Sequence, residues 1–170
     1  MSLGLETERL RLRPWRESDL PAYAEFCASD AAEFVGGRCS AEDAWRRIAT
    51  FLGHWALRGF GPWIMVDKSS GRPAGYTGLW MPSGWPEGEI LWSLFDGFRG
   101  RGFATEAATH VRRHAYEELG WATAASFIHP KNAASLAVAE RLGCAREGAI
   151  DLRGATIEIW RHPPPSRLLN

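Results

Sequence analysis

The sequence predicts an α/β (α+β) domain with a mixed sheet of about seven strands and helices on both faces. Segments with alternating apolar residues follow one another between segments with helical spacing, and glycines stand at most of the boundaries. An apolar share of 45% is enough for a real core. The expected element order is β-αα-βββ-α-β-α-ββ, which places helices against both faces of one sheet.

One strand and two helices are expected first. Residues 9–13 alternate Arg and Leu, the pattern of a strand with one apolar face. Ser18 or Asp19 can cap a helix that runs to about residue 28. Residues 40–43 resemble a capping box, with Asp in place of the usual Glu, and the helical spacing behind them continues until Gly59.

Three strands and a long helix follow. The strands are expected at residues 63–66, 74–81 and 89–95, with a hairpin turn between the first two. The helix starts at Gly102 or Phe103 and reaches about residue 119, where a glycine terminates it.

In the last part of the chain, strands and a helix again follow one another. Residues 123–128 are strand-like, and Asn132 can cap a helix that ends before Gly143. Two closing strands lie near Ile150 and over residues 156–160. One domain over residues 1–162 with a tail over 163–170 accounts for the whole chain.

The most informative segment is a glycine-rich turn between the third of these strands and the long helix. Arg99, Gly102 and Ala104 fit the spacing [Gln/Arg]-x-x-Gly-x-[Gly/Ala]. Glycines let a ligand approach the backbone, and the free N–H groups and dipole of the helix start attract an anion. Arg99 and Arg101 add full charges, so the turn predicts a pyrophosphate site, although a plain tight turn has the same spacing. The absence of Gly-Lys-Ser/Thr and the mid-chain position argue against nucleotide hydrolysis and hydride transfer.

Charge and cysteine content indicate which partners and which cellular compartment to expect. The formal net charge is zero, so no global field favours nucleic acid or an anionic membrane. The first 13 residues carry charges throughout and contain no apolar leader, and three cysteines form no paired framework. We therefore expect a cytoplasmic protein with no membrane or nucleic-acid partner, as a monomer or a homodimer.

Four segments in order resemble the GNAT superfamily of acyl-CoA-dependent N-acyltransferases. The glycine-rich turn resembles its pyrophosphate loop, and residues 132–135 and 139–144 resemble its Asn-x-x-Ser and Glu-Lys-Leu-Gly-Phe segments, with Arg141 for Lys and Cys144 for Phe. Residues 5–13 and 102–107 are typical of the branch that contains the RimJ/RimL-type ribosomal-protein acetyltransferases. The resemblance implies a mostly antiparallel sheet and transfer of an acetyl group from acetyl-CoA to a primary amine. The amine is a protein N-terminus or a small molecule, and the alternative is a catalytically silent acyl-CoA-binding module.

The resemblance also assigns roles to individual residues. Ser135 has the position of the proton donor to the departing thiolate, and Glu89 is the best candidate for a general base. A helix-surface hydroxyl and a solvated strand-start carboxylate are the respective alternatives. Asn132 is a plain N-cap or a cap that also contacts the pantetheine arm. The residues expected to bind acetyl-CoA are Trp92, Leu94, Arg99, Gly100, Arg101, Gly102, Phe103, Ala104, Thr105 and Asn132.

Histidines and tryptophans offer weaker candidates. His129 is a second possible base, whereas His110 and His114 lie four residues apart on what we expect to be an exposed helix face. That spacing suits a metal, but no third ligand is evident, so no metal is expected. Trp45, Trp55 and Trp85 could line an acceptor cleft, with core packing as the alternative for each.

Overall fold

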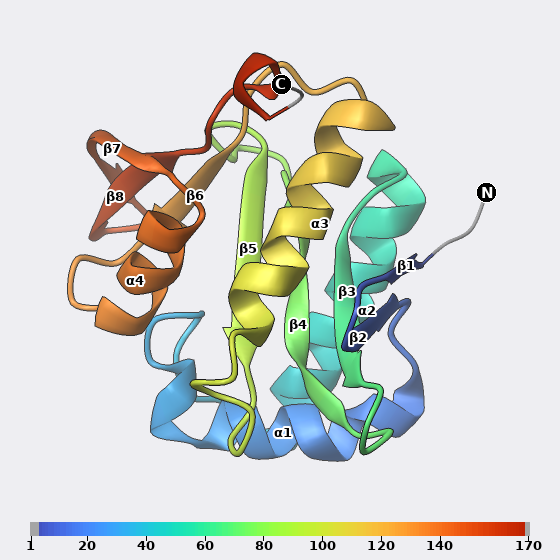
Figure 1. Ribbon diagram of the computed structural model, residues 1–170. Helices are drawn as coiled ribbons and strands as arrows, with labels where there is room; N and C mark the ends of the chain where they lie inside the picture. The colour runs from blue at the N-terminus through green and yellow to red at the C-terminus, as the bar shows by residue number, and fades with distance from the viewer. Residues whose placement is uncertain (1–3, 169–170) are drawn as a thin grey trace.

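The computed structural model describes residues 4–168, which form one sheet with helices on both faces (Figure 1). The predicted tail ends in two residues that lie outside the described range, as do the first three residues of the chain. The helices are α1 (Leu20–Ala28), α2 (Ala41–Arg58), α3 (Phe103–Glu117) and α4 (Ala133–Arg141). The strands are β1 (Leu5–Glu6), β2 (Leu10–Arg13), β3 (Pro62–Asp67), β4 (Pro73–Trp80), β5 (Glu89–Leu94), β6 (Ala125–Ile128), β7 (Ala145–Leu152) and β8 (Ala155–Arg161).

The sheet is mixed and mostly antiparallel, as expected. Its spatial order is β1-β2-β3-β4-β5-β6-β8-β7, and β5 with β6 is the one parallel pair among the described strands. It has eight strands rather than about seven because Leu5 and Glu6 pair with Leu12 and Arg11. Two residues are too few to show an alternating pattern, so this edge strand left no signal in the sequence.

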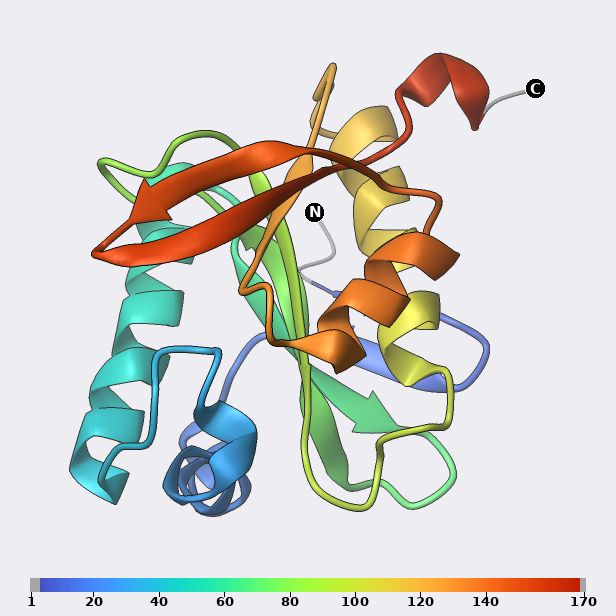
Figure 2. The same cartoon turned by 90° about the vertical axis from the view of Figure 1, so that its left-hand side faces the viewer.

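The helices pack in two layers. Figure 2 shows α1 and α2 on one side of the sheet and α3 and α4 on the other. The central strands β3 and β4 are therefore buried on both faces and consist mostly of apolar residues. On β2 only one face is covered, so Leu10 and Leu12 are fully buried and Arg11 is exposed, as the alternation predicted.

Most of the predicted helix ends are confirmed. Ser40 Oγ accepts a hydrogen bond from Asp43 N at 3.1 Å, and Gly59 closes α2 in the left-handed region at φ 76°. Asp19 stands at the start of α1 but does not cap it. Its carboxylate instead accepts hydrogen bonds from the Arg13 guanidinium at 2.7 and 2.8 Å, because the partly buried Arg13 needs a counter-charge.

Two compositional features have structural counterparts. Cys27 and Cys144 are buried, Cys39 is half-buried, and all three are free thiols. None of the helices in the described part of the chain is long and apolar enough to cross a membrane.

Candidate functional site

A cleft opens where the sheet splits. The parallel ladder between β5 and β6 consists of the single pair Glu89 and Ala125. Immediately beyond it Ser126 Oγ donates a hydrogen bond to the Ile90 carbonyl at 2.6 Å. The ladder ends there, and beyond it the edge of β5 faces a cavity.

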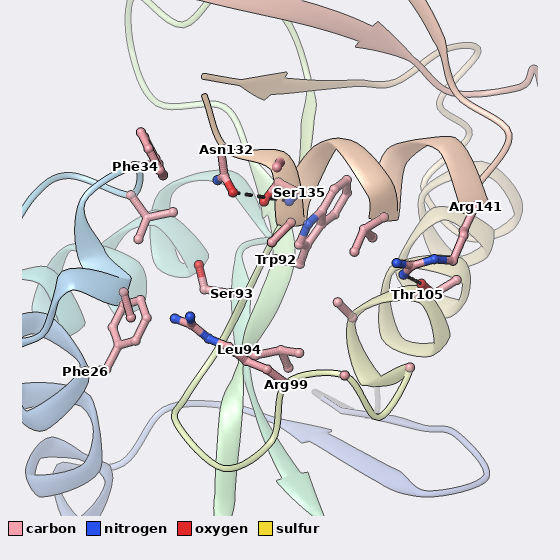
Figure 3. A pocket seen from close by; sticks show the side chains of 18 of the residues that line it. Phe26, Phe34, Trp92, Ser93, Leu94, Arg99, Thr105, Asn132, Ser135 and Arg141 are labelled. Atoms are coloured by element: carbon pink, nitrogen blue, oxygen red, sulfur yellow. Dashed lines mark hydrogen bonds between the residues drawn. The ribbon is translucent and has the colours of Figure 1, made fainter. Parts of the chain in front are cut away.

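The main cavity has a volume of about 870 Å³ and is shown in Figure 3. Its walls come from four separate parts of the chain: the end of α1 with the α1–α2 connection, the second half of β5, the glycine-rich turn with the first turn of α3, and one side of α4 with its N-cap. The residues of each wall that matter below are Phe26 and Phe34; Trp92, Ser93 and Leu94; Arg99, Gly100, Gly102, Ala104, Thr105 and Glu106; and Asn132, Ser135, Val138 and Arg141.

The glycine-rich turn has the geometry of an anion site. Gly100 and Gly102 adopt the left-handed region at φ 72° and 78°, which bends the chain into the first turn of α3. The N–H groups of that turn have no helical partners, and the helix dipole adds positive potential at the same place. Arg99 points into the cavity from the same turn (Figure 3), so a full positive charge and the free N–H donors of the helix start line the same cavity.

Two of the predicted turn residues do not line this wall. Phe103 is fully buried in the core, and the Arg101 guanidinium lies over the Phe103 ring at 4.5 Å from its centroid. The sequence alone could not show that Arg101 faces away from the cavity, because in a turn the side-chain direction depends on each φ and ψ. The charge on this wall thus comes from Arg99 and the helix start.

The β5 wall carries Trp92 and Leu94, two residues predicted to contact acetyl-CoA. Trp92 is buried, and its indole Nε1 has no hydrogen-bond partner in the described structure. A buried N–H without a partner costs about 1–3 kcal/mol. Because Nε1 is inaccessible to solvent, other atoms of Trp92 and not this donor line the cavity. The adjacent edge of β5 presents extended backbone of the kind that an amide-containing arm can pair with.

The start of α4 supplies Asn132 and Ser135. Asn132 Oδ1 accepts a hydrogen bond from Ser135 N at 3.2 Å, so Asn132 is an N-cap as predicted and also lines the cavity. The hydroxyl of Ser135 makes no hydrogen bond to any residue between 4 and 168 and is half-buried at the cavity wall. Ser135 is therefore not a residue of the outer helix surface.

A second, smaller cavity of about 50 Å³ adjoins the first between β5 and β6. Both cavities are lined by Phe34, Val35, Trp92, Asn132 and Ser135, and Glu89 lines the small one. The two residues predicted to move protons, Ser135 and Glu89, thus lie on the same small cavity.

Glu89 is buried, with 7% of its surface exposed, which overturns the alternative of a solvated strand-start residue. The Trp85 indole donates to its carboxylate at 2.9 Å. Burial raises the pKa of Glu89 to about 8, although hydrogen bonds from the Phe127 backbone and from Trp85 lower it in part. A carboxyl group with a pKa near neutrality in a cavity can accept a proton there.

The three histidine candidates have different surroundings: one lines a cavity and two pack elsewhere. His129 lines the small cavity, and its ring stacks on Phe34 with centroids 4.9 Å apart. His110 and His114 are half-buried rather than exposed, because the His114 ring packs on Trp63 and His110 Nδ1 bonds the Glu106 carbonyl. No group of three metal-ligating side chains occurs among the described residues.

The three tryptophans proposed for an acceptor cleft do not line either cavity. Trp45 is half exposed on α2, and Trp55 packs on Trp63 and donates to the Pro62 carbonyl at 3.0 Å. Trp85 contributes to the site in another way, by its hydrogen bond to Glu89.

Two further lining residues were not among the predicted site residues. Phe34 reaches the cavities from the α1–α2 connection, a loop without a motif. Arg141 lies at the end of α4, with its Nη1 3.5 Å from Thr105 Oγ1 (Figure 3). Its position in the family-like segment could have marked it as a second cation near the turn.

Comparisons with known proteins agree with this geometry. A family model described as acetyltransferase (GNAT) domain matches residues 9–145. Among solved structures, the chain is similar to an acetyltransferase from Agrobacterium tumefaciens, with 34% identity, a TM-score of 0.87 and 94% of each chain covered. A ribosomal-protein-S5-alanine acetyltransferase from Vibrio fischeri shares the fold at 18% identity and a TM-score of 0.74, over 95% of this chain and 97% of that one. An aminoglycoside acetyltransferase, AAC(6')-Ib in complex with coenzyme A, shares it at 18% identity and a TM-score of 0.78, over 94% and 97%.

Proposed function

Because the chain belongs to the GNAT acetyltransferase family, we propose that it transfers an acetyl group from acetyl-CoA to a primary amine by direct attack on the thioester. The observation that carries this proposal is that Ser135 lines both cavities. One cavity has the anion-binding turn, and the other has Glu89. A donor molecule in the first and an amine in the second would meet at Ser135.

The donor set of the large cavity suits acyl-CoA. The first-turn N–H groups of α3 and the Arg99 guanidinium would hold a pyrophosphate. The edge of β5 would pair with the amide-containing arm, and Trp92 and Leu94 would line its path. Acetyl-CoA supplies the acetyl group in activated form, as a thioester. A backbone N–H of β5 would then stabilise the negative charge that develops on the thioester oxygen.

The proton-transfer roles follow from the small cavity. An amine attacks only when neutral, and free α-amines have a pKa of about 7.7–8.0 against about 10.4 for lysine. Glu89 accepts the proton that the amine loses, directly or through one water. Ser135 donates a proton to the CoA sulfur as the C–S bond breaks and regains one from water, while Glu89 releases its proton to solvent. With its pKa near 8, Glu89 takes this role increasingly as the pH rises toward that value.

For the acceptor we propose a protein N-terminal α-amine, as in the RimJ/RimL-type branch that residues 5–13 and 102–107 resemble. A small-molecule amine is the second candidate. The known structures of this fold include both a ribosomal-protein acetyltransferase and an aminoglycoside acetyltransferase. An α-amine requires the smaller shift in pKa and suits a site whose base ionises only near pH 8.

The alternative is a module that binds acyl-CoA without chemistry. A panel of amines with acetyl-CoA, read by release of free thiol and by mass spectrometry of the products, separates the two. Peptides with a free N-terminus, matched N-blocked peptides containing lysine, polyamines and aminoglycosides form the panel. Acetylation of any amine supports the enzyme, and its position on the product identifies the acceptor class. CoA binding without product on any member would favour the silent module.

A further inference from the structure

The turn between β1 and β2 contacts the first turn of α3, although 97 residues separate the two in sequence. Thr7 Oγ1 donates to Glu106 Oε1 at 2.5 Å, and the Arg9 backbone N–H donates to the same oxygen at 2.8 Å. Arg9 Nε donates to Glu106 Oε2 at 2.7 Å. We call these three residues the clasp. They satisfy both oxygens of a carboxylate that lines the main cavity.

The clasp also fixes one peptide of the glycine-rich turn. Arg9 Nη1 donates to the Arg101 carbonyl at 2.8 Å. The described residues contain no cis peptide bond, so the C=O of Arg101 and the N–H of Gly102 point in opposite directions. Holding that carbonyl on the Arg9 side turns the Gly102 N–H away from Arg9. Gly102 itself lines the main cavity.

The negative charge of Glu106 would oppose anion binding at the start of α3 if Arg9 did not neutralise it. A free carboxylate in the first turn of a helix competes with any anionic ligand for the same N–H groups and dipole. Arg9 neutralises it, and the Arg9 guanidinium in turn lies over the Phe103 ring at 4.8 Å from its centroid. Burial alone would raise the pKa of Glu106, but the hydrogen bonds from Thr7 and Arg9 outweigh it and lower the pKa.

We propose that Arg9 and Glu106 are positioning residues for the diphosphate of acyl-CoA, acting through the peptide between Arg101 and Gly102. The inference rests on the proposed function. It gives a joint physical role to the two segments on which the resemblance to the RimJ/RimL-type branch rests, since Thr7 and Arg9 belong to one and Glu106 to the other.

Arg9→Gln, Arg9→Lys and Glu106→Gln test the role against Arg11→Gln as the matched control. Arg11 lies two residues further along the chain, on β2, and its substitution removes the same charge. Its guanidinium pairs with exposed Glu6 and not with Glu106 or the glycine-rich turn. The readouts are calorimetric affinities for CoA and for pantetheine, which lacks the diphosphate, together with the melting temperature. Because a hydrogen bond to a charged group contributes about 1.5–3 kcal/mol, we expect Arg9→Gln and Glu106→Gln to bind CoA at least about tenfold more weakly.

The pantetheine affinity should stay unchanged in all variants, and the CoA affinity should stay unchanged in Arg11→Gln. Arg9→Lys keeps the charge but not the forked geometry, so it should fold and still lose CoA affinity. If all variants bind CoA like wild type, or lose CoA and pantetheine affinity equally, the positioning role is wrong while the proposed function stands. If wild type binds neither ligand, the proposed function and this inference fail together.

Discussion

The buried carboxyl of Glu89 gives the most quantitative prediction. Glu89→Gln keeps the size and the hydrogen-bond acceptor for Trp85 but removes the titrating group. With a pKa of about 8, Glu89 is ionised to roughly 3% at pH 6.5 and roughly 76% at pH 8.5. If the ionised form is the base, its contribution to kcat/KM grows roughly 25-fold over that range.

The assay is the kcat/KM of the best amine against pH, for wild type and variant, with acetyl-CoA saturating. Ionisation of the amine affects both proteins alike. The ratio of the wild-type kcat/KM to the variant kcat/KM therefore reports the contribution of Glu89 alone. We expect this ratio to rise with pH and level off above about pH 8. Glu118→Gln, an exposed carboxyl just beyond α3, is the control and should give a ratio that does not change. A flat ratio for Glu89→Gln, or one that falls with pH, refutes the assignment of Glu89 as the base.

The same group makes stability depend on pH. Its pKa is raised in the folded state, so between about pH 4.5 and 8 the folded protein binds more protons than the unfolded chain. The contribution of Glu89 to the free energy of unfolding therefore falls as pH rises through this window. Thermal unfolding should show Glu89→Gln gaining stability relative to wild type from pH 5 to pH 8. A constant difference would contradict the raised pKa.

Three further predictions test other parts of the site. Gly102→Ala and Gly120→Ala both force a side chain into the left-handed region, at φ 78° and 69°, and each should cost about 1–2 kcal/mol of stability. Calorimetry should show weaker CoA binding for Gly102→Ala, which lies in the glycine-rich turn, and unchanged binding for Gly120→Ala, which lies beyond the other end of α3. Equal CoA affinity in the two variants would show that the turn is not part of the binding site. Ser135→Ala should lower kcat by about 10²–10⁴-fold at an unchanged Kd for acetyl-CoA, and an unaltered single-turnover rate would exclude it as the proton donor. Trp85→Phe removes a hydrogen bond that lowers the pKa of Glu89, so the pH–rate profile should move to higher pH; a profile that stays in place would show that the bond does not tune the base.

Features with local causes could be predicted from the sequence. The helix that starts at Ser40 and the cap at Asn132 depend on side chains bonding their own neighbours, and both are present. The anion-binding turn likewise follows from glycines whose positive φ values are needed where they stand. These elements required no knowledge of the tertiary structure.

Features with distant causes could not be predicted. Glu89 is buried because β5 is central in the sheet and Trp85 bonds it, and nothing in the local pattern distinguishes it from a solvated strand start. His114 packs on Trp63, more than 50 positions earlier in the chain, so helical spacing alone suggested exposure. The contact of Arg9 with Glu106 is of the same kind.

The central claim is that the cleft beside the start of α3 binds acyl-CoA. Titration calorimetry of the wild-type protein with CoA tests it most directly, since the measurement requires neither the acceptor nor turnover. We predict saturable binding at one site per chain with a Kd below the millimolar range, and a rise in melting temperature with CoA concentration that follows from mass action. A folded protein that releases no heat of binding and shows no shift in melting temperature at millimolar CoA would contradict the claim.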